Sequence, residues 1–241
     1  LGREVALKLM RPEQLWFEGA HRRFLREAEA IASLAHPGIV SIHAFGEHDG
    51  LPFCAMEFIA GRSLGEILDG LRGRDPSTLR PGSIGQPGAR NWTEACFSLA
   101  LQVASALRHA HARAIVHRDV KPSNIMLDAE GRVRLIDFGL AHLARSESMT
   151  HTGTQPGSLA YMSPEQLRGE SIDARTDIYS LGVTLYELLA LRMPFRGNNE
   201  EQMRRAILDA AAPRVDSINR GVARDAAAVV ERTMAPEPSR R

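Results

Sequence analysis

Residues 117–124, His-Arg-Asp-Val-Lys-Pro-Ser-Asn, bring an acid, a lysine and an amide together within six positions. An acid such as Asp119 can orient a hydroxyl group and accept its proton, and Lys121 can stabilise the charge on a phosphoryl group in transit. The side-chain carbonyl oxygen of Asn124 can bind a metal ion. This combination is specific, and it indicates phosphoryl transfer.

Two other patterns are weak alone and gain weight from their order. Residues 137–139, Asp-Phe-Gly, follow a strand predicted over 132–136 and begin eighteen residues after Asp119. Their Asp offers Mg²⁺ a hard oxygen ligand, and their Gly lets the backbone turn. Lys8 lies in a short apolar strand after Val-Ala-Leu. Because lysines commonly flank buried strands, Lys8 counts only together with the other motifs.

The elements that must position these residues change in type along the chain. Strands are predicted over 4–10, 39–45 and 51–58, with Asp-Gly at 49–50 as a hairpin turn. Apolar residues spaced three and four positions apart predict helices over 18–34, 95–111, 178–191 and 225–234. Thr93 is the predicted N-cap of the second of these helices. Strands first and helices later predict an α+β fold with two lobes.

Residues 70–91 differ from the rest because they are rich in Gly, Pro and Arg. This composition predicts a flexible, solvated insertion, and the alternative is a loop that docks a partner.

The composition excludes several classes of protein. The chain has 241 residues, of which 44% are hydrophobic and 24% charged, with a net charge of +1. Such a balance is globular, and near-neutral charge argues against a nucleic-acid surface. No apolar run approaches the roughly 20 residues that span a bilayer. Cys54 and Cys96 make no disulfide framework, so a reducing interior is expected. The nine histidines show no metal-ligand spacing.

Four motifs in order make the chain resemble a eukaryotic-type protein kinase domain of the bacterial serine/threonine branch: Val-Ala-Leu-Lys at 5–8, residues 117–124, residues 137–139, and Ser-Pro-Glu at 163–165. The resemblance implies a two-lobed α+β fold with a small β-rich N-lobe and a larger helical C-lobe. It implies a partial N-lobe over 1–57, a hinge over 58–61 and a C-lobe over 62–241, with 70–91 inserted. It also implies truncation at both ends, because the family's Gly-rich loop precedes the lysine strand.

The same resemblance implies a site that binds ATP and Mg²⁺. Asp119 would be the catalytic base, with Lys121 and Asn124 beside it, and Asp137 and Asn124 would hold the metal. Lys8 would bind phosphates and pair with Glu27, and Glu29 is the rival partner. In the rest of the nucleotide pocket, Met56 would be the gatekeeper, and the hinge backbones of Glu57 and Ile59 would bind adenine. Ala6 and Met126 would sandwich the adenine ring, and Glu66 would contact the ribose.

Structural roles also follow from the family pattern. Asp177 would anchor the catalytic loop from a buried helix, and Glu165 would pair with Arg241. A stacked apolar spine would link the lobes through Ile31, Ile42, His117 and Phe138.

The implied substrates are Ser and Thr hydroxyls of proteins, because Lys121 is typical of the serine/threonine type. Residues 157–165 would dock the substrate, with Ser158 where the family usually has Thr. Phosphorylation would order the activation loop through Arg118, at Thr150, Thr152 or Thr154, with the first two favoured.

The resemblance also implies a setting and leaves other functions open. We expect self-phosphorylation in a dimer and no nucleic acid as partner. The expected location is the cytoplasm, which includes the case of the cytoplasmic domain of a membrane-anchored protein. No membrane segment is expected in this chain. One alternative is a non-catalytic kinase-like interaction module, since the Gly-rich loop is absent. A small-molecule phosphotransferase is another, against which Ser-Pro-Glu at 163–165 argues.

Overall fold

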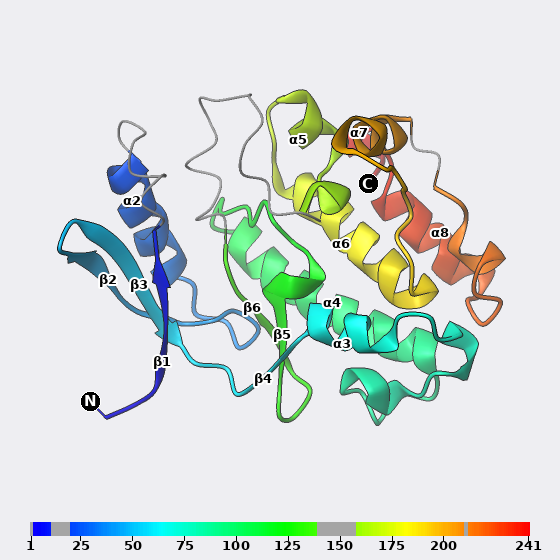
Figure 1. The fold of residues 1–241 in the computed structure, drawn as a ribbon, viewed down its shortest axis with the longest axis horizontal. Coiled ribbons are helices and arrows are strands. Elements are labelled where there is room, and N and C mark those ends of the chain that lie inside the picture. Colours follow the sequence, from blue (N-terminus) through cyan, green and yellow to red (C-terminus); the bar gives the residue numbers. More distant parts are fainter. Residues whose placement is uncertain (1, 11–19, 139–157, 210–211) are drawn as a thin grey trace.

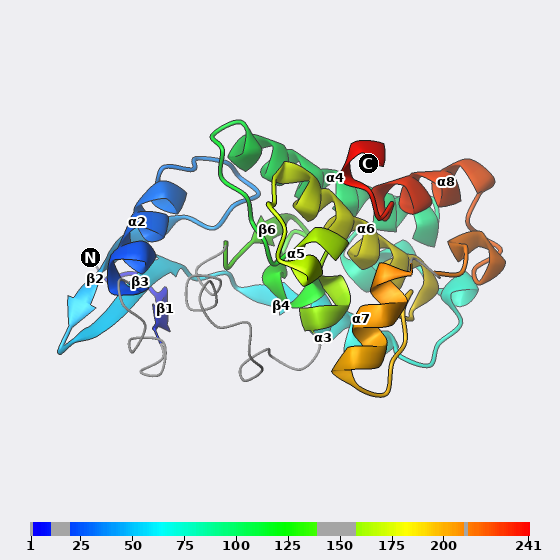
Figure 2. The same cartoon turned by 90° about the horizontal axis from the view of Figure 1, so that it is seen from above.

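A computed structural model of the protein describes residues 2–10, 20–138, 158–209 and 212–241. Sheet dominates the first part and helix the second, as predicted (Figure 1). The N-terminal sheet is antiparallel, in the order β1 (Val5–Leu9), β3 (Leu51–Glu57), β2 (Ile42–His48). Helix α2 (Ala20–Ala32) packs against β2 and β3 (Figures 1 and 2).

Local chemistry explains the hairpin between β2 and β3. Asp49 and Gly50 both have positive φ, 50° and 78°, which a two-residue hairpin turn of this hand requires. Every second residue of β3 is buried, which places Cys54 and Met56 on the inner face. The register sets Lys8, at the middle of the edge strand β1, opposite Cys54 of the central strand β3.

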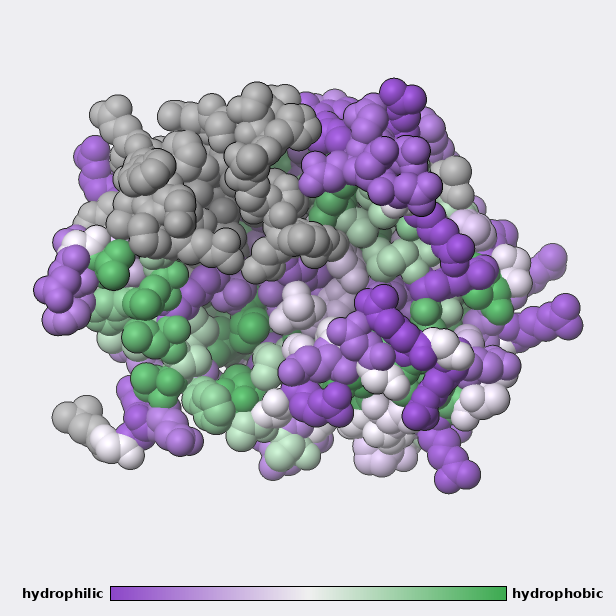
Figure 3. Space-filling view, viewed as in Figure 1, coloured by the Kyte–Doolittle hydropathy of each residue, from purple (hydrophilic) through white to green (hydrophobic). Residues whose placement is uncertain are grey.

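The outer face of β1 is apolar. Val5, Leu7 and Leu9 alternate along the strand and are 42%, 60% and 53% exposed. Hydrophobic residues accordingly gather over this sheet in the space-filling view (Figure 3).

A second antiparallel sheet lies between the two parts of the molecule, in the order β4 (Gly61–Ser63), β5 (Ile125–Asp128), β6 (Val133–Leu135). It carries the catalytic motifs, because β5 follows residues 117–124 and β6 precedes Asp137. Val40 N donates to Leu135 O at 2.9 Å, and Leu135 N donates to Gly38 O at 2.8 Å. These bonds join the segment after α2 to the sheet that holds the motifs.

Helix α6 (Ala174–Ala190) is the centre of the helical part, and it is buried on nearly all sides. Helices α4 (Trp92–His111) and α8 (Arg224–Thr233) pack against it, and α8 approaches so closely that a Cβ on Gly182 would lie 2.4 Å from Thr233 Oγ1. The other described helices are α3 (Leu64–Leu71), α5 (Pro164–Arg168) and α7 (Glu200–Leu208). None of the described helices combines the length and apolarity needed to cross a membrane.

The prediction for 70–91 was wrong in that the segment is not merely a solvated loop. Two 3₁₀ turns, Pro76–Thr78 and Pro81–Ile84, follow the end of α3, and Ile84 is fully buried. Gln86 Nε2 donates to Gly131 O at 2.8 Å. The segment is packed because a few apolar residues among its Gly and Pro are buried against the helical part.

The N-cap of α4 was also misassigned. Asn91, not Thr93, caps the helix, and its Oδ1 accepts from Glu94 N at 2.9 Å. The first helical residue, Trp92, is buried, and its Nε1 donates to Leu188 O of α6 at 3.0 Å. Both the local cap and this tertiary contact therefore favour the earlier start.

Candidate active site

Residues 117–124, which the family resemblance identifies as the catalytic loop, are tied at their start to α6 by one buried carboxylate. Asp177 accepts from His117 N and Arg118 N, each at 2.8 Å, and contacts His111 Nε2 at 2.7 Å. Arg118 has φ +67°, a conformation that costs a non-glycine residue free energy unless its surroundings impose it. The predicted anchoring role of Asp177 is confirmed.

His117 links the loop to residues 136–138. Its Nε2 lies 3.0 Å from Ile136 O, and Asp119 N donates to its Nδ1 at 3.3 Å. Burial lowers the pKa of His117, so the ring is neutral, with its proton assigned to Nε2 by these partners. The ring packs on Phe138 with centroids 4.4 Å apart. The spine prediction therefore holds at this contact; Ile31 is also buried, and Ile42 packs against the same core.

Asp119 is oriented by two residues that follow it in the same loop. Lys121 Nζ lies 2.7 Å from Asp119 Oδ2, and Asn124 Nδ2 donates to the same oxygen at 2.9 Å. Both partners therefore use one carboxylate oxygen, which leaves Oδ1 as the atom to meet a hydroxyl group. The side chain is 21% exposed, enough to be reached by a substrate.

Residues 158–165 lie against this loop. Lys121 Nζ donates to Ser158 Oγ at 2.8 Å, so Ser158 supplies the hydroxyl expected there. Arg241 binds both oxygens of Glu165, at 2.6 and 2.8 Å, and the two side chains are 0% and 4% exposed. Burial raises the pKa of Glu165, but hydrogen bonds from Arg241 and Thr176 outweigh it and leave that pKa below its usual value. The predicted ion pair is confirmed.

The predicted pairing of Lys8 with Glu27 was wrong. Lys8 Nζ pairs with Asp137 Oδ1 at 2.7 Å, and Glu27 Oε1 faces Arg118 Nη1 at 3.8 Å. Burial raises the pKa of Glu27, partly opposed by the Arg118 charge. Its Oε2 is buried without a hydrogen-bond partner among the described residues. Local sequence could not reveal this, because the partner of Glu27 depends on where α2 lies relative to the catalytic loop.

The residues predicted to hold adenine lie on the two sheets. Ala6 is opposite Met56 in the β1–β3 register, and Met126 lies on β5. The amide of Glu57 is already engaged with Ser41 O at 2.9 Å, so the predicted backbone contact of this residue with adenine could use only its carbonyl. Ile59 is half-buried against the core.

Glu66, predicted to contact the ribose, has a structural partner. Its Oε2 accepts from Ser63 N at 2.8 Å and from Ser63 Oγ at 3.0 Å, which completes a capping box on α3. These hydrogen bonds lower the pKa of Glu66. The Ser-x-x-Glu pattern would have predicted this role.

The donor set fits a magnesium ion that is shared with a nucleotide. Asn124 uses its amide nitrogen on Asp119, so its carbonyl oxygen points the other way. Asp137 adds a carboxylate that is 34% exposed. Among the described residues, no group of three or more His, Cys, Asp or Glu side chains could hold a metal. Because Mg²⁺ is commonly held by one or two protein ligands plus phosphates, this pair is sufficient.

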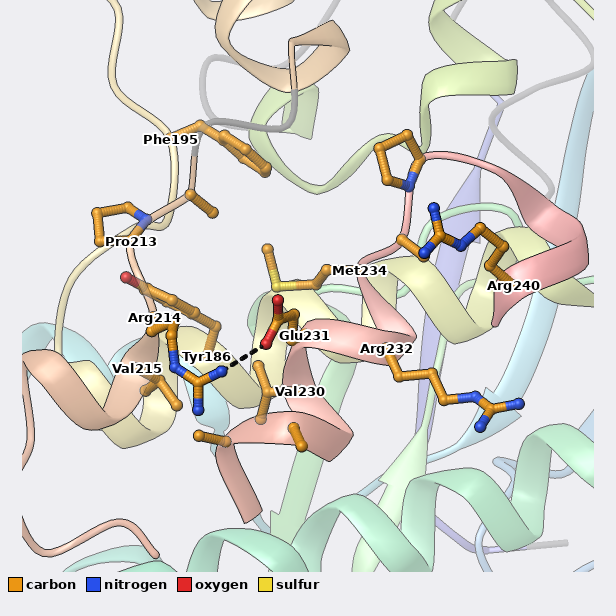
Figure 4. Close-up of a pocket in the computed structure, with 15 residues that line it drawn as sticks. Tyr186, Phe195, Pro213, Arg214, Val215, Val230, Glu231, Arg232, Met234 and Arg240 are labelled. Atoms are coloured by element: carbon orange, nitrogen blue, oxygen red, sulfur yellow. Dashed lines mark hydrogen bonds and ion pairs between the residues drawn. The ribbon is translucent and has the colours of Figure 1, made fainter. Parts of the chain in front are cut away.

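A cavity of about 650 Å³ lies elsewhere, among α6, α8 and residues 212–215 (Figure 4). Tyr186 and Phe195 contribute aromatic walls, and Arg214 and Glu231 form an ion pair of 2.9 Å at its side. The predicted site residues are not among those that line it.

Some residues of the predicted motifs lie outside the described residues, namely Thr150, Thr152, Thr154, Gly139 and Gly157.

Sequence reasoning missed Gln166 of α5. Its Nε2 donates to Arg118 O at 2.9 Å, which links the helix to the catalytic loop. The Ser-x-x-Gln pattern at 163–166 signals a capping box, but no local signal indicates the second contact.

Comparison with known proteins agrees with this geometry. The family model described as "Protein kinase domain" matches residues 1–241, and the chain belongs to that family. It is 36% identical over its whole length to the serine/threonine-protein kinase PrkC of Bacillus subtilis and 35% identical to PknB of Mycobacterium leprae. It spans 35% and 37% of those proteins, about a third of their length.

A solved structure supports the fold assignment. The crystal structure of the Mycobacterium tuberculosis PknI kinase domain matches all of the chain and 80% of its own, with a TM-score of 0.71 and 29% identity. The two-lobed α+β prediction is confirmed.

Proposed function

We propose that the chain transfers the γ-phosphate of ATP to Ser and Thr hydroxyls of proteins, with Asp119 as catalytic base. The observation that carries the proposal is the convergence of Lys121 and Asn124 on Asp119 Oδ2, which leaves the other carboxylate oxygen for a hydroxyl group. The homologous serine/threonine kinases support the reaction class.

The described residues divide the chemistry among them. Asp119 Oδ1 orients the hydroxyl and takes its proton, while the Lys121 charge stabilises the transferred group. Asp137 and Asn124 would hold Mg²⁺, which neutralises phosphate charge when it is bound. Lys8 would leave Asp137 to bind the phosphates, and Ala6, Met56, Glu57, Ile59, Glu66 and Met126 stay predicted nucleotide contacts.

The test compares the natural full-length protein with its Asp119→Asn variant in Mg²⁺ and ATP. Phosphate incorporation into a protein substrate or the kinase itself is measured by intact mass and by initial rate. Because general-base catalysis contributes about 10²–10⁴-fold, the variant should lose at least a hundredfold in rate. Equal rates would remove Asp119 from the mechanism. No incorporation by the wild type would favour the non-catalytic interaction module instead.

Regulation extends the proposal to the segment outside the described residues. Phosphate on Thr150 or Thr152 would attract Arg118, which now faces Glu27 at 3.8 Å. We expect the Thr150→Ala/Thr152→Ala variant to retain only a small part of the activity, because Arg118 would stay with Glu27. Tandem mass spectrometry of the autophosphorylated protein and an activity assay test this, and an unchanged rate would contradict it. Thr154 is the third candidate.

A further inference from the structure

The peptide unit immediately before the Asp119 side chain is held at both of its polar atoms. Its carbonyl, Arg118 O, accepts from Gln166 Nε2 at 2.9 Å, and its amide, Asp119 N, donates to His117 Nδ1 at 3.3 Å. Because a peptide unit is planar and rigid, these two bonds together fix the peptide plane and with it the Cα from which the Asp119 side chain leaves the backbone.

The other end of the Gln166 amide is also engaged. Its Oε1 accepts from Ser163 N at 3.0 Å, and Ser163 Oγ lies at 3.3 Å. Only one amide orientation satisfies both sides, because the reverse would set Oε1 against the carbonyl of Arg118. Gln166 therefore donates to the catalytic loop and accepts within the capping box of α5.

We propose that Gln166 is a positioning residue for Asp119, which it orients through the Arg118 carbonyl and couples to the substrate-docking segment 158–165. The proposal rests on the proposed kinase function. It concerns a residue outside the four family motifs that carried the sequence prediction.

Two neighbouring features make Gln166 a firm support. The helix that bears it is fixed by the buried pair of Glu165 with Arg241. The residue that it contacts, Arg118, has φ +67° and is held at its amide by Asp177. The amide and the carbonyl of this strained residue are therefore held by separate elements, α6 and α5, and the carbonyl side depends on Gln166.

The Gln166→Glu variant separates the two roles of the side chain. Glutamate still accepts from Ser163 N, since Glu and Gln both complete a capping box, but it cannot donate to Arg118 O. We expect kcat to fall about tenfold, which corresponds to about 1.4 kcal/mol, with the KM for ATP unchanged and the melting temperature lowered less than in Gln166→Ala. Hydrogen exchange at the Asp119 amide should accelerate in the variant.

Gln202→Glu is the matched control. Gln202 holds the equivalent helix position in α7, where its Oε1 accepts from Asn198 N at 2.9 Å on the exposed surface. This variant should keep kcat. Gln166→Ala, which loses both contacts of Gln166, should lower both kcat and the melting temperature.

The outcomes are distinguishable. A Gln166→Glu variant with wild-type kcat and wild-type exchange at Asp119 would overturn the positioning role, as would an equal loss in Gln202→Glu. If the wild type itself transfers no phosphate, the proposed function fails, whereas exchange at the Asp119 amide still decides whether Gln166 holds the loop.

Discussion

The two sides of the active site differ in how deeply their charged groups are buried and in how many hydrogen bonds these groups form. On the helical side, Asp177 and the pair of Glu165 with Arg241 are almost fully buried, and each carboxylate accepts several hydrogen bonds. On the sheet side, Lys8 and Asp137 are 28% and 34% exposed and form an ion pair of 2.7 Å. Glu27 lies 3.8 Å from Arg118, and its buried Oε2 has no hydrogen-bond partner in the part of the chain that the structure describes.

This difference indicates which parts of the site are built in and which can exchange partners. A buried carboxylate with several donors has one favourable arrangement, because any other leaves polar groups without partners. A half-exposed ion pair can exchange its partner for water or phosphate at little cost. The helical side therefore holds the loop that carries Asp119 in one arrangement, while the ion pair of the sheet side can change partners, as the proposed nucleotide binding requires.

The largest expected effect concerns the helical side. Arg241→Ala leaves the Glu165 carboxylate buried and unpaired, which should lower the free energy of unfolding by about 3–5 kcal/mol. Urea denaturation measures it. Arg205→Ala is the control, because Arg205 and Glu201 are 74% and 65% exposed and should contribute less than about 1 kcal/mol. Equal losses in the two variants would break the contrast.

A smaller effect is expected for the sheet side. Lys8→Met, Asp137→Asn and their combination form a double-mutant cycle, with unfolding followed in the absence of nucleotide. The coupling energy should stay below about 1 kcal/mol, since both groups are partly hydrated. A coupling of about 3 kcal/mol would show that the pair is as fixed as that of Glu165.

The smallest effect is a pH dependence at Glu27. Its folded pKa is raised above 4.5, so the folded protein holds this proton more tightly than the unfolded chain does. Wild-type stability relative to Glu27→Gln should therefore increase as the pH falls from above the folded pKa to 4.5. Thermal unfolding between pH 4 and 8 measures the difference.

Glu29→Gln, exposed on the same helix, controls for the substitution itself. If the stability of the wild type relative to Glu27→Gln instead increased as the pH rises, the raised pKa would be contradicted.

Part of the candidate site could be predicted from local spacing and motifs alone. Asp119, Lys121 and Asn124 are so near in the chain that their local backbone brings them together, and the structure finds them in contact. Asp177 and the pair of Glu165 with Arg241 were predictable because their motifs are distinctive. The strand-to-helix order likewise followed from periodicity.

Local patterns did not predict which distant segments meet. Glu27 faces Arg118 rather than Lys8 because of where α2 lies, which no local pattern encodes. Gln166 reaches Arg118 across 48 positions, and Ile84 is buried although its neighbours read as a loop. Local propensity acts over a few residues, whereas the partner of a side chain depends on how whole elements pack, and packing is a property of the folded chain.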